Sequence, residues 1–324
     1  MRIHHLNCVS ACPLGGALMD GFTRGVRARL TCHCLLLELN DRLVLVDTGY
    51  GLRDVADPYS RLNRLFLFMM SPDFRAEMTA VRQIEALGFN PRDVRDIVLT
   101  HLDFDHAGGL DDFPGAAVHM LDSELHSASR QRTFLDRMRY RPQQWGTRSN
   151  WRTYTADGDS WRGFECVREI GSLPPEILML PTRGHTFGHA AIAVANGPQW
   201  LVYAGDAYFY HAEMDPERPY CTPGLRFYQW MMEKDRRARL QNQRRLREIK
   251  LEPDIRLFCA HDVKEFETLS SRRESVPAVR DTSAPLAAQR GAGVNVRRAR
   301  AQAGRNRGAR RMRGRAPGGD EARR

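Results

Sequence analysis

Residues 97–110, IVLTHLDFDHAGGL, concentrate side chains that bind metal ions. A buried strand is expected to end just before His101, and Asp103, Asp105 and His106 follow within the next five residues. Packing two imidazoles and two carboxylates together without a cation would incur desolvation and carboxylate repulsion. Because metal ions remove both costs, this cluster predicts a metal centre.

Three later stretches add donors of the same kind. They are PTRGHTFGH (residues 181–189), LVYAGD (residues 201–206) and LFCAHD (residues 257–262). The first holds His185 and His189 in a Gly-rich turn, and the other two place Asp206 and His261 at the end of an apolar run. Such positions are expected when several strand ends of one sheet meet at a site.

The elements that must position these donors follow from hydrophobic patterning. Residues 31–47 predict a β-hairpin that turns at Asn40-Asp41. Further strands are expected at residues 97–99, 116–120, 176–180, 190–195, 200–203 and 255–260, and helices at residues 73–87 and 229–250. Residues 130–165 show no period and are interpreted as an irregular cap. Without a repeat or GxGxxG, this order favours a layered α/β sandwich over a doubly wound nucleotide fold.

The formal net charge of +10 comes from the end of the chain. Residues 271–324 hold 15 Arg and 4 acidic residues, which leaves 34 basic and 35 acidic residues before them. The nearly neutral part lacks the basic footprint of a dedicated nucleic-acid binder. The Arg-rich tail is too poor in large apolar residues to fold, so we expect disorder and at most weak electrostatic binding to nucleic acid.

The seven cysteines show no disulfide-framework spacing. Cys8-x3-Cys12 and Cys32-His33-Cys34 could be zinc half-sites, but reduced cysteines that fill core space are the favoured interpretation. No run approaches the ~18 apolar residues of a membrane span, and residues 1–21 lack the apolar segment of a signal peptide. A cytoplasmic protein is therefore expected.

The ordered motifs DTG, HxxxDHxGG, GHTxGH, GD and AHD resemble the metallo-β-lactamase superfamily over roughly residues 30 to 265. Within it, the run ALGFNPRDVRDIVLTHLDFDHAGGL is most similar to lactonase-like hydrolases, which include N-acyl homoserine lactonases. The resemblance implies an α/β fold, the four-layer αββα sandwich, over residues 1–269. Residues 270–324 would be the disordered tail.

The resemblance also implies a ligand set for two metal ions. His101, Asp103 and His185 would form the first site, Asp105, His106 and His261 the second, and Asp206 would bridge them. Asp47 of the DTG motif would orient ligands through hydrogen bonds, and His189 would support the site without binding metal.

Asp103 departs from the family's commonest HxHxDH pattern, in which a His stands at this position. Family precedents for a carboxylate here include the flavodiiron proteins, so Asp103 is retained as a ligand. Two divalent ions and three carboxylates leave a charge of +1, against +2 with His. Zinc is the ion expected from the family, while the additional oxygen donor favours manganese or iron.

The activity implied by the resemblance is binuclear metal-dependent hydrolysis of a small-molecule substrate. A water bridging the ions, with its pKa lowered toward ~7, would supply the hydroxide that attacks a lactone, ester or thioester carbonyl. Asp105 and Asp206 are the expected catalytic carboxylates. Homoserine lactonases carry a substrate-contacting Tyr three residues after the bridging Asp; Phe209 holds that position here, so the adjacent Tyr208 is the candidate.

Two alternatives remain open. A phosphodiesterase or nuclease of the same fold is favoured by Asp103 and by the Arg-rich tail. A non-catalytic metal-binding member is favoured only by the missing His. The apolar run from Leu65 to Met70, expected near the cleft, favours the carbonyl hydrolase.

Overall fold

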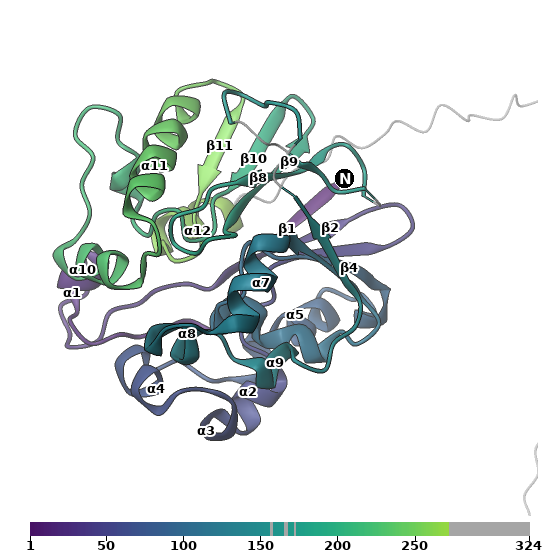
Figure 1. Ribbon diagram of the computed structural model, residues 1–324, viewed down its shortest axis with the longest axis horizontal. Coiled ribbons are helices and arrows are strands. Elements are labelled where there is room, and N and C mark those ends of the chain that lie inside the picture. The colour runs from purple at the N-terminus through teal and green to yellow at the C-terminus, as the bar shows by residue number, and fades with distance from the viewer. Residues whose placement is uncertain (156–157, 165–167, 172, 272–324) are drawn as a thin grey trace, which may run out of the picture. The chain divides into compact units, whose positions relative to one another are not determined.

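The computed structural model describes residues 1–271 except 156–157, 165–167 and 172 (Figure 1). Residues 1–274 form one unit of the chain. The expectation of a disordered tail at 270–324 falls almost wholly outside the described residues. Over the part that is described, no helix combines the length and apolar character needed to cross a membrane.

The first sheet contains six strands in sequential order. They are β1 (Arg2–Asn7), β2 (His33–Glu38), β3 (Leu43–Val46), β4 (Val94–Val98), β5 (Ala117–Leu121) and β6 (Trp151–Tyr154). The strands from β1 to β3 pair antiparallel, and those from β3 to β6 pair parallel. The β2–β3 pair is the predicted hairpin. Two edge strands, β1 and β6, were not predicted, and β6 lies in the stretch interpreted as an irregular cap.

The second sheet has the strand order β11-β10-β9-β8-β7. Its strands are β7 (Arg168–Glu169), β8 (Ile177–Pro181), β9 (Ala190–Asn196), β10 (Gln199–Tyr203) and β11 (Ile255–Phe258). The strands from β7 to β10 pair antiparallel, while β10 and β11 are parallel. The four longer strands of this sheet lie where the sequence predicted them.

Helices flank both sheets (Figure 1). The α-helices are α1 (Ala17–Asp20), α2 (Leu52–Ala56), α3 (Pro58–Arg61), α4 (Arg64–Met70), α5 (Ala80–Ala86), α6 (Phe104–Ala107), α7 (Asp122–Arg130), α8 (Phe134–Arg139), α9 (Pro142–Trp145), α10 (Pro223–Met232), α11 (Arg236–Lys250) and α12 (Val263–Ser270). Short 3-10 helices are η1 (Ala76–Met78), η2 (Pro91–Asp93), η3 (Gly108–Asp112) and η4 (His211–Met214). The helix predicted at 73–87 is therefore shorter, because Thr79 is the N-cap of α5.

Alternating side chains of the strands divide the core into layers. In β2, Leu36 packs with Ile84 of α5, while Leu35 and Leu37 face the second sheet. On the far side, Leu246 of α11 packs against the outer face of the second sheet. Each fully buried Leu contributes roughly 1.5–3 kcal/mol relative to an exposed one. The period of two thus produces the helix–sheet–sheet–helix sandwich that the sequence predicted.

The single helix predicted at 229–250 is wrong, because the chain breaks between α10 and α11. The Asp235 carboxylate accepts from the Ala238 N–H at 2.9 Å and so caps α11. The N–H groups of Lys234 and Asp235 donate to the Gly184 carbonyl, at 2.8 and 3.0 Å. The break therefore ties this junction to the GHTFGH loop.

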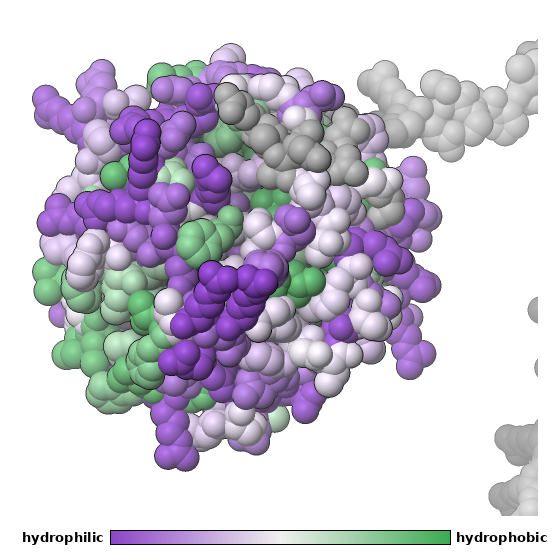
Figure 2. All heavy atoms as spheres, in the orientation of Figure 1, coloured by the Kyte–Doolittle hydropathy of each residue, from purple (hydrophilic) through white to green (hydrophobic). Residues whose placement is uncertain are grey.

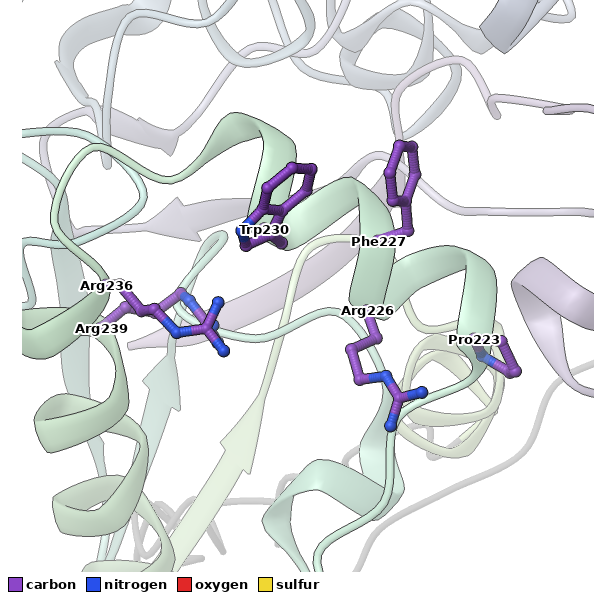
Figure 3. A pocket seen from close by; sticks show the side chains of 6 residues that line it. All are labelled: Pro223, Arg226, Phe227, Trp230, Arg236 and Arg239. Atoms are coloured by element: carbon purple, nitrogen blue, oxygen red, sulfur yellow. The ribbon is translucent and has the colours of Figure 1, made fainter.

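Arginines line the junction between α10 and α11 (Figure 3). Arg226 of α10 and Arg236 and Arg239 of α11 border a cavity of about 400 Å³. Arg239 donates to Glu233 at 2.6 Å and to Gln229 at 3.1 Å. These bonds fix the angle between the two helices, and α10 is thereby held over the metal-type residues described next.

Among the described residues, neither cysteine pair forms a metal-type group, and three of the four cysteines are buried, while Cys12 is partly exposed. Cys8 and Cys34 are buried free thiols within the helix–sheet layer, and Cys32 donates to the Asp105 carbonyl at 2.8 Å. The metal-type groups found among the described residues contain no cysteine. The preference for reduced, space-filling cysteines agrees with this placement.

Candidate metal centre

Parallel strands deliver the metal-type side chains to one place. Asp47 follows β3 and His101 follows β4, and these strands are parallel neighbours in the first sheet. Asp206 follows β10 and His261 follows β11, which are parallel neighbours in the second sheet. Because the carboxyl ends of parallel strands lie at one edge, Asp47 and His101 lie at one edge of the first sheet, and Asp206 and His261 at one edge of the second. The two edges meet, since His101 Nε2 is 3.8 Å from Asp206 Oδ2.

The structure brings the seven predicted ligands together in two groups. The first group contains His101, Asp103, His185 and Asp206, and the second contains Asp105, His106 and His261. Within each group the donor atoms lie within 4.8 Å of one another. All seven side chains are buried, and Asp105 is the most exposed at 9%.

Asp206 lies between the two groups and faces both. Its Oδ1 is 3.3 Å from Nε2 of His106 and 3.1 Å from Nε2 of His261. Its Oδ2 is 3.8 Å from Nε2 of His101 and 3.4 Å from Nε2 of His185. One carboxylate oxygen thus faces each group, so Asp206 would contact ions held in either one.

Buried atoms without hydrogen-bond partners show that cations fit here. Nε2 of His101, Nε2 of His106 and Oδ1 of Asp206 are buried and make no hydrogen bond. Ligands about 2.0–2.1 Å from a tetrahedral zinc ion are separated by roughly 3.4 Å. The spacing of 3.4 Å between His101 Nε2 and Asp103 Oδ2 is of this size. Both the donor chemistry and the spacing therefore suit divalent metal ions.

Asp47 orients the ligands by accepting four hydrogen bonds. Its carboxylate accepts from the N–H of Thr100 at 2.8 Å, the Thr100 hydroxyl at 2.8 Å and the Tyr203 hydroxyl at 2.9 Å. Nδ1 of His106 lies 2.7 Å from it, so this nitrogen carries the proton and Nε2 keeps its lone pair. Asp47 has φ of 55°, a conformation that such a fully bonded site can hold.

Two further histidines are oriented through their outer nitrogens. Nδ1 of His101 lies 2.9 Å from the Thr100 hydroxyl, whose own proton goes to Asp47. Nδ1 of His261 donates to the Thr31 carbonyl at 2.8 Å. In both rings the lone pair of Nε2 is therefore left to face the site.

His189 lies behind the centre, and the backbone engages its ring nitrogens. Nε2 accepts from the Asp206 N–H at 2.9 Å, and Nδ1 lies 3.2 Å from the Thr182 carbonyl. Gly188 lets this loop approach α7, because a Cβ there would lie 2.1 Å from the Glu124 nitrogen. Buried Glu124 accepts from the Gly188 N–H at 3.1 Å and from the Leu102 N–H at 3.0 Å. Sequence reasoning missed this carboxylate, which joins the two ligand loops.

Arg139 is a second charged residue that sequence reasoning missed. It ends α8 and is fully buried, and its Nε and Nη2 donate to the two oxygens of Asp103 at 2.7 and 2.5 Å. Burial raises the pKa of Asp103, but the Arg139 charge together with the imidazoles of His101 and His185 outweighs burial and holds that pKa well below its usual range. Including Arg139 corrects the count for two bound ions from +1 to +2.

The aromatic residues near the centre differ from the sequence expectation. The Tyr208 hydroxyl donates to the Glu265 carboxylate at 3.0 and 3.1 Å, within the core beneath α11. Phe209 instead stacks on His261, with ring centroids 5.1 Å apart and planes at 13°. Tyr228 of α10, which the sequence did not single out, packs against Phe209 at 5.6 Å.

The predicted apolar run borders this aromatic cluster. Phe66 and Met70 of α4 are buried in the same core cluster as Phe104 and Phe209. The rings of Phe66 and Phe104 lie 5.0 Å apart. Helix α4 therefore packs against α6, the helix that carries Asp105 and His106, so the apolar run lies near the cluster as expected from the sequence.

Comparison with known families agrees with this geometry. Residues 27–261 match the family described as "Metallo-beta-lactamase superfamily". A protein of Mycobacterium tuberculosis named "Probable metallo-hydrolase" is 38% identical over 265 residues, covering 81% of this chain and 80% of that protein. An N-acyl homoserine lactonase of a Bacillus species is 25% identical, covering 78% of this chain and 92% of that protein.

Solved structures share the fold at lower identity. An N-acyl homoserine lactone hydrolase with N-hexanoyl-L-homoserine bound at its metal centre is 22% identical, with a TM-score of 0.62. The likeness covers 82% of this chain and 95% of that one. The dizinc quorum-quenching lactonase AidC is 15% identical with a TM-score of 0.55, over 80% and 86% of the two chains.

Asp206→Asn should lower the affinity for both ions, because each oxygen of Asp206 faces one ligand group. In equilibrium dialysis against excess zinc, we expect the folded variant to retain fewer ions than the wild-type protein. Asp262→Asn is the matched control, since this buried neighbour of His261 bonds His211 and belongs to neither group. Wild-type zinc content in Asp206→Asn would remove Asp206 from the centre.

Proposed function

Because this chain belongs to the metallo-beta-lactamase superfamily, we propose that it is a binuclear metal-dependent hydrolase that opens a lactone, ester or thioester. The observation that carries the proposal is the pair of buried ligand groups on either side of Asp206. The seven side chains described above would hold two divalent cations, and zinc is the expected ion.

Bound cations polarise the substrate carbonyl and lower the pKa of water toward ~7. The residues of the chain then have separate tasks. Asp206 contacts both ligand groups and holds them next to each other, while Asp47 fixes the orientation of the His106 ring by a hydrogen bond. Asp105 is the candidate proton carrier: it is the most exposed of the seven side chains, at 9%, and is therefore the best placed of the carboxylates to pass a proton to the leaving oxygen.

Tyr228 is our candidate for the hydrogen-bond donor to the substrate oxygen. Burial raises the pKa of its hydroxyl well above the usual value, and the negative charges of Asp105, Asp103 and Asp206 raise it further. The phenol therefore keeps its proton at neutral pH and can donate. The Tyr208 hydroxyl already donates to Glu265, so we assign the donor role to Tyr228 in its place.

Apolar surroundings support a substrate with a hydrophobic portion. Hydrophobic side chains gather on the face where α1, α4 and α10 lie (Figures 1 and 2). Leu18, Phe68, Phe227 and Trp230 of these helices are more than half exposed. A cavity of about 220 Å³ beside His261 is lined in part by Leu30, Phe209 and Leu225. The lactonase names of several relatives point to the same substrate class.

Phosphodiesters are the alternative substrates, and a specific observation favours them. The side chains of Arg29 and Lys264 line the same cavity beside His261 and would attract an anionic group, whereas the carboxylates of Asp20 and Asp262 in the same lining would repel it. The apolar side chains exposed on α1, α4 and α10 and the nearly neutral charge of residues 1–270 favour the carbonyl substrate over this alternative.

Substrate class is tested directly with chromogenic compounds. We expect the zinc-loaded protein to hydrolyse an aryl ester or a lactone with a kcat/KM at least ~100-fold above that for bis-p-nitrophenyl phosphate. Protein treated with a chelator should lose both activities. A preference for the phosphodiester would replace the carbonyl proposal, and no turnover of either class by metal-loaded protein would favour a non-catalytic role.

Tyr228→Phe should lower kcat/KM for the preferred substrate by roughly 100-fold, the scale typical of losing one donor to a developing oxyanion. Metal content and fold should be unchanged, because the ring remains. Tyr208→Phe is the matched control, and we expect it to lower stability with little effect on kcat/KM. Equal kinetic losses in the two variants would argue against the role of Tyr228.

A further inference from the structure

All five N–H groups of Arg139 have acceptors, and two of the accepting residues, Asp103 and His185, are predicted metal ligands. Besides its two bonds to Asp103, the guanidinium donates from Nη1 to the Met232 carbonyl at 2.7 Å and to the His185 carbonyl at 3.4 Å. Its Nη2 lies 2.7 Å from Nε2 of His185. The same nitrogen lies 3.0 Å from Oδ2 of Asp103, so it has two close neighbours. Because a guanidinium can only donate, a hydrogen bond at the shorter contact, the one to Arg139, requires His185 to accept with its lone pair.

This contact sets His185 apart from the other three histidine ligands. Nε2 of His101 and Nε2 of His106 are buried without hydrogen-bond partners, and Nε2 of His261 faces the Asp206 carboxylate at 3.1 Å. An imidazole lone pair accepts one hydrogen bond or binds one metal ion. The first group therefore has one lone pair already occupied, whereas the imidazole lone pairs of the second group face the site without a competing donor.

Charge adds to the asymmetry. The Arg139 guanidinium carries a full positive charge inside the first group, where little solvent screens it. A divalent ion entering between Asp103 and His185 meets that charge at short range. Asp206 faces both groups, so the difference lies in the other carboxylate of each. Asp103 in the first group is paired with the guanidinium, whereas the guanidinium makes no hydrogen bond to Asp105 in the second group.

We infer that Arg139 makes the two metal sites unequal. This inference rests on the proposed binuclear centre. The second group, Asp105, His106 and His261, binds one ion tightly together with Oδ1 of Asp206. The first group, His101, Asp103 and His185, binds the other ion more weakly together with Oδ2 of Asp206, because Arg139 must release His185 before that ion can bind. Arg139 is thus a positioning residue that controls the occupancy of the first site.

Calorimetric titration of the metal-free protein with zinc, in the presence of a competing chelator, measures both affinities. We expect the two dissociation constants of the wild-type protein to differ by at least ~100-fold. His261→Ala should lose the tight ion, whereas His185→Ala should retain it with an affinity within about threefold of the wild-type value. These readouts do not depend on the activity of the enzyme.

Paired substitutions separate the effect of Arg139 from that of Asp103. Asp103→His alone leaves the buried guanidinium without its counter-charge, so we expect the variant to bind only the tight ion. Asp103→His combined with Arg139→Met removes both charges and should bring the two affinities within about tenfold. The matched control is Asp54→Asn combined with Arg61→Met. These two residues form another buried ion pair, with 2.7 Å between Arg61 Nε and Asp54 Oδ1, and they belong to neither ligand group. It should keep the wild-type ratio.

The outcomes distinguish this inference from the proposed function. Two zinc ions bound by the wild-type protein with equal affinity would overturn the role of Arg139 and leave the binuclear hydrolase intact. An unchanged ratio in the Asp103→His, Arg139→Met protein would also overturn it. If the wild-type protein binds no zinc at all, both the inference and the proposed function fail.

Discussion

The burial of three carboxylates and four imidazoles in one place is the constraint on which the rest of this structure depends. Each of these groups would have water as its partner on the surface, and removing that water without compensation costs several kcal/mol for an ionised group. Hydrogen bonds to the outer atoms of the ligands compensate only in part, since Nε2 of His101, Nε2 of His106 and Oδ1 of Asp206 are left without partners. The fold therefore buries a set of lone pairs that two bound cations would satisfy.

Arg139 shows why such a site has to be analysed as a whole. The substitution of a carboxylate for the commoner histidine at position 103 is accompanied by a buried guanidinium that neutralises it. The charge of the centre is then the same as with a neutral histidine, but the hydrogen bonds differ, because Arg139 also takes the lone pair of His185. Two ligand groups of similar composition therefore acquire different affinities for a metal ion.

The sequence could single out metal-type residues that the fold brings together, because several of them directly follow a strand; their division into two ligand sets came from the family resemblance and stays a prediction. An apolar run followed directly by His or Asp shows both the strand and its carboxyl edge, and this held for His101, Asp206 and His261. Arg139, Glu124 and Tyr228 could not be found in this way. Arg139 is one of 49 basic residues, lies 36 positions after Asp103, and makes its contact only when α8 folds across the site. The break between α10 and α11 was missed for a similar reason, since its partner is the distant Gly184 carbonyl.

Anomalous X-ray scattering at the zinc edge, from crystals of the wild-type protein grown with zinc, shows where zinc binds and how fully each site is occupied. We expect two peaks on opposite sides of the Asp206 carboxylate. One should be fully occupied among Asp105, His106 and His261, and a weaker one should lie among His101, Asp103 and His185. A single ion bound by residues of both groups at once, or zinc held by residues outside the seven, would rule out two ions on either side of Asp206.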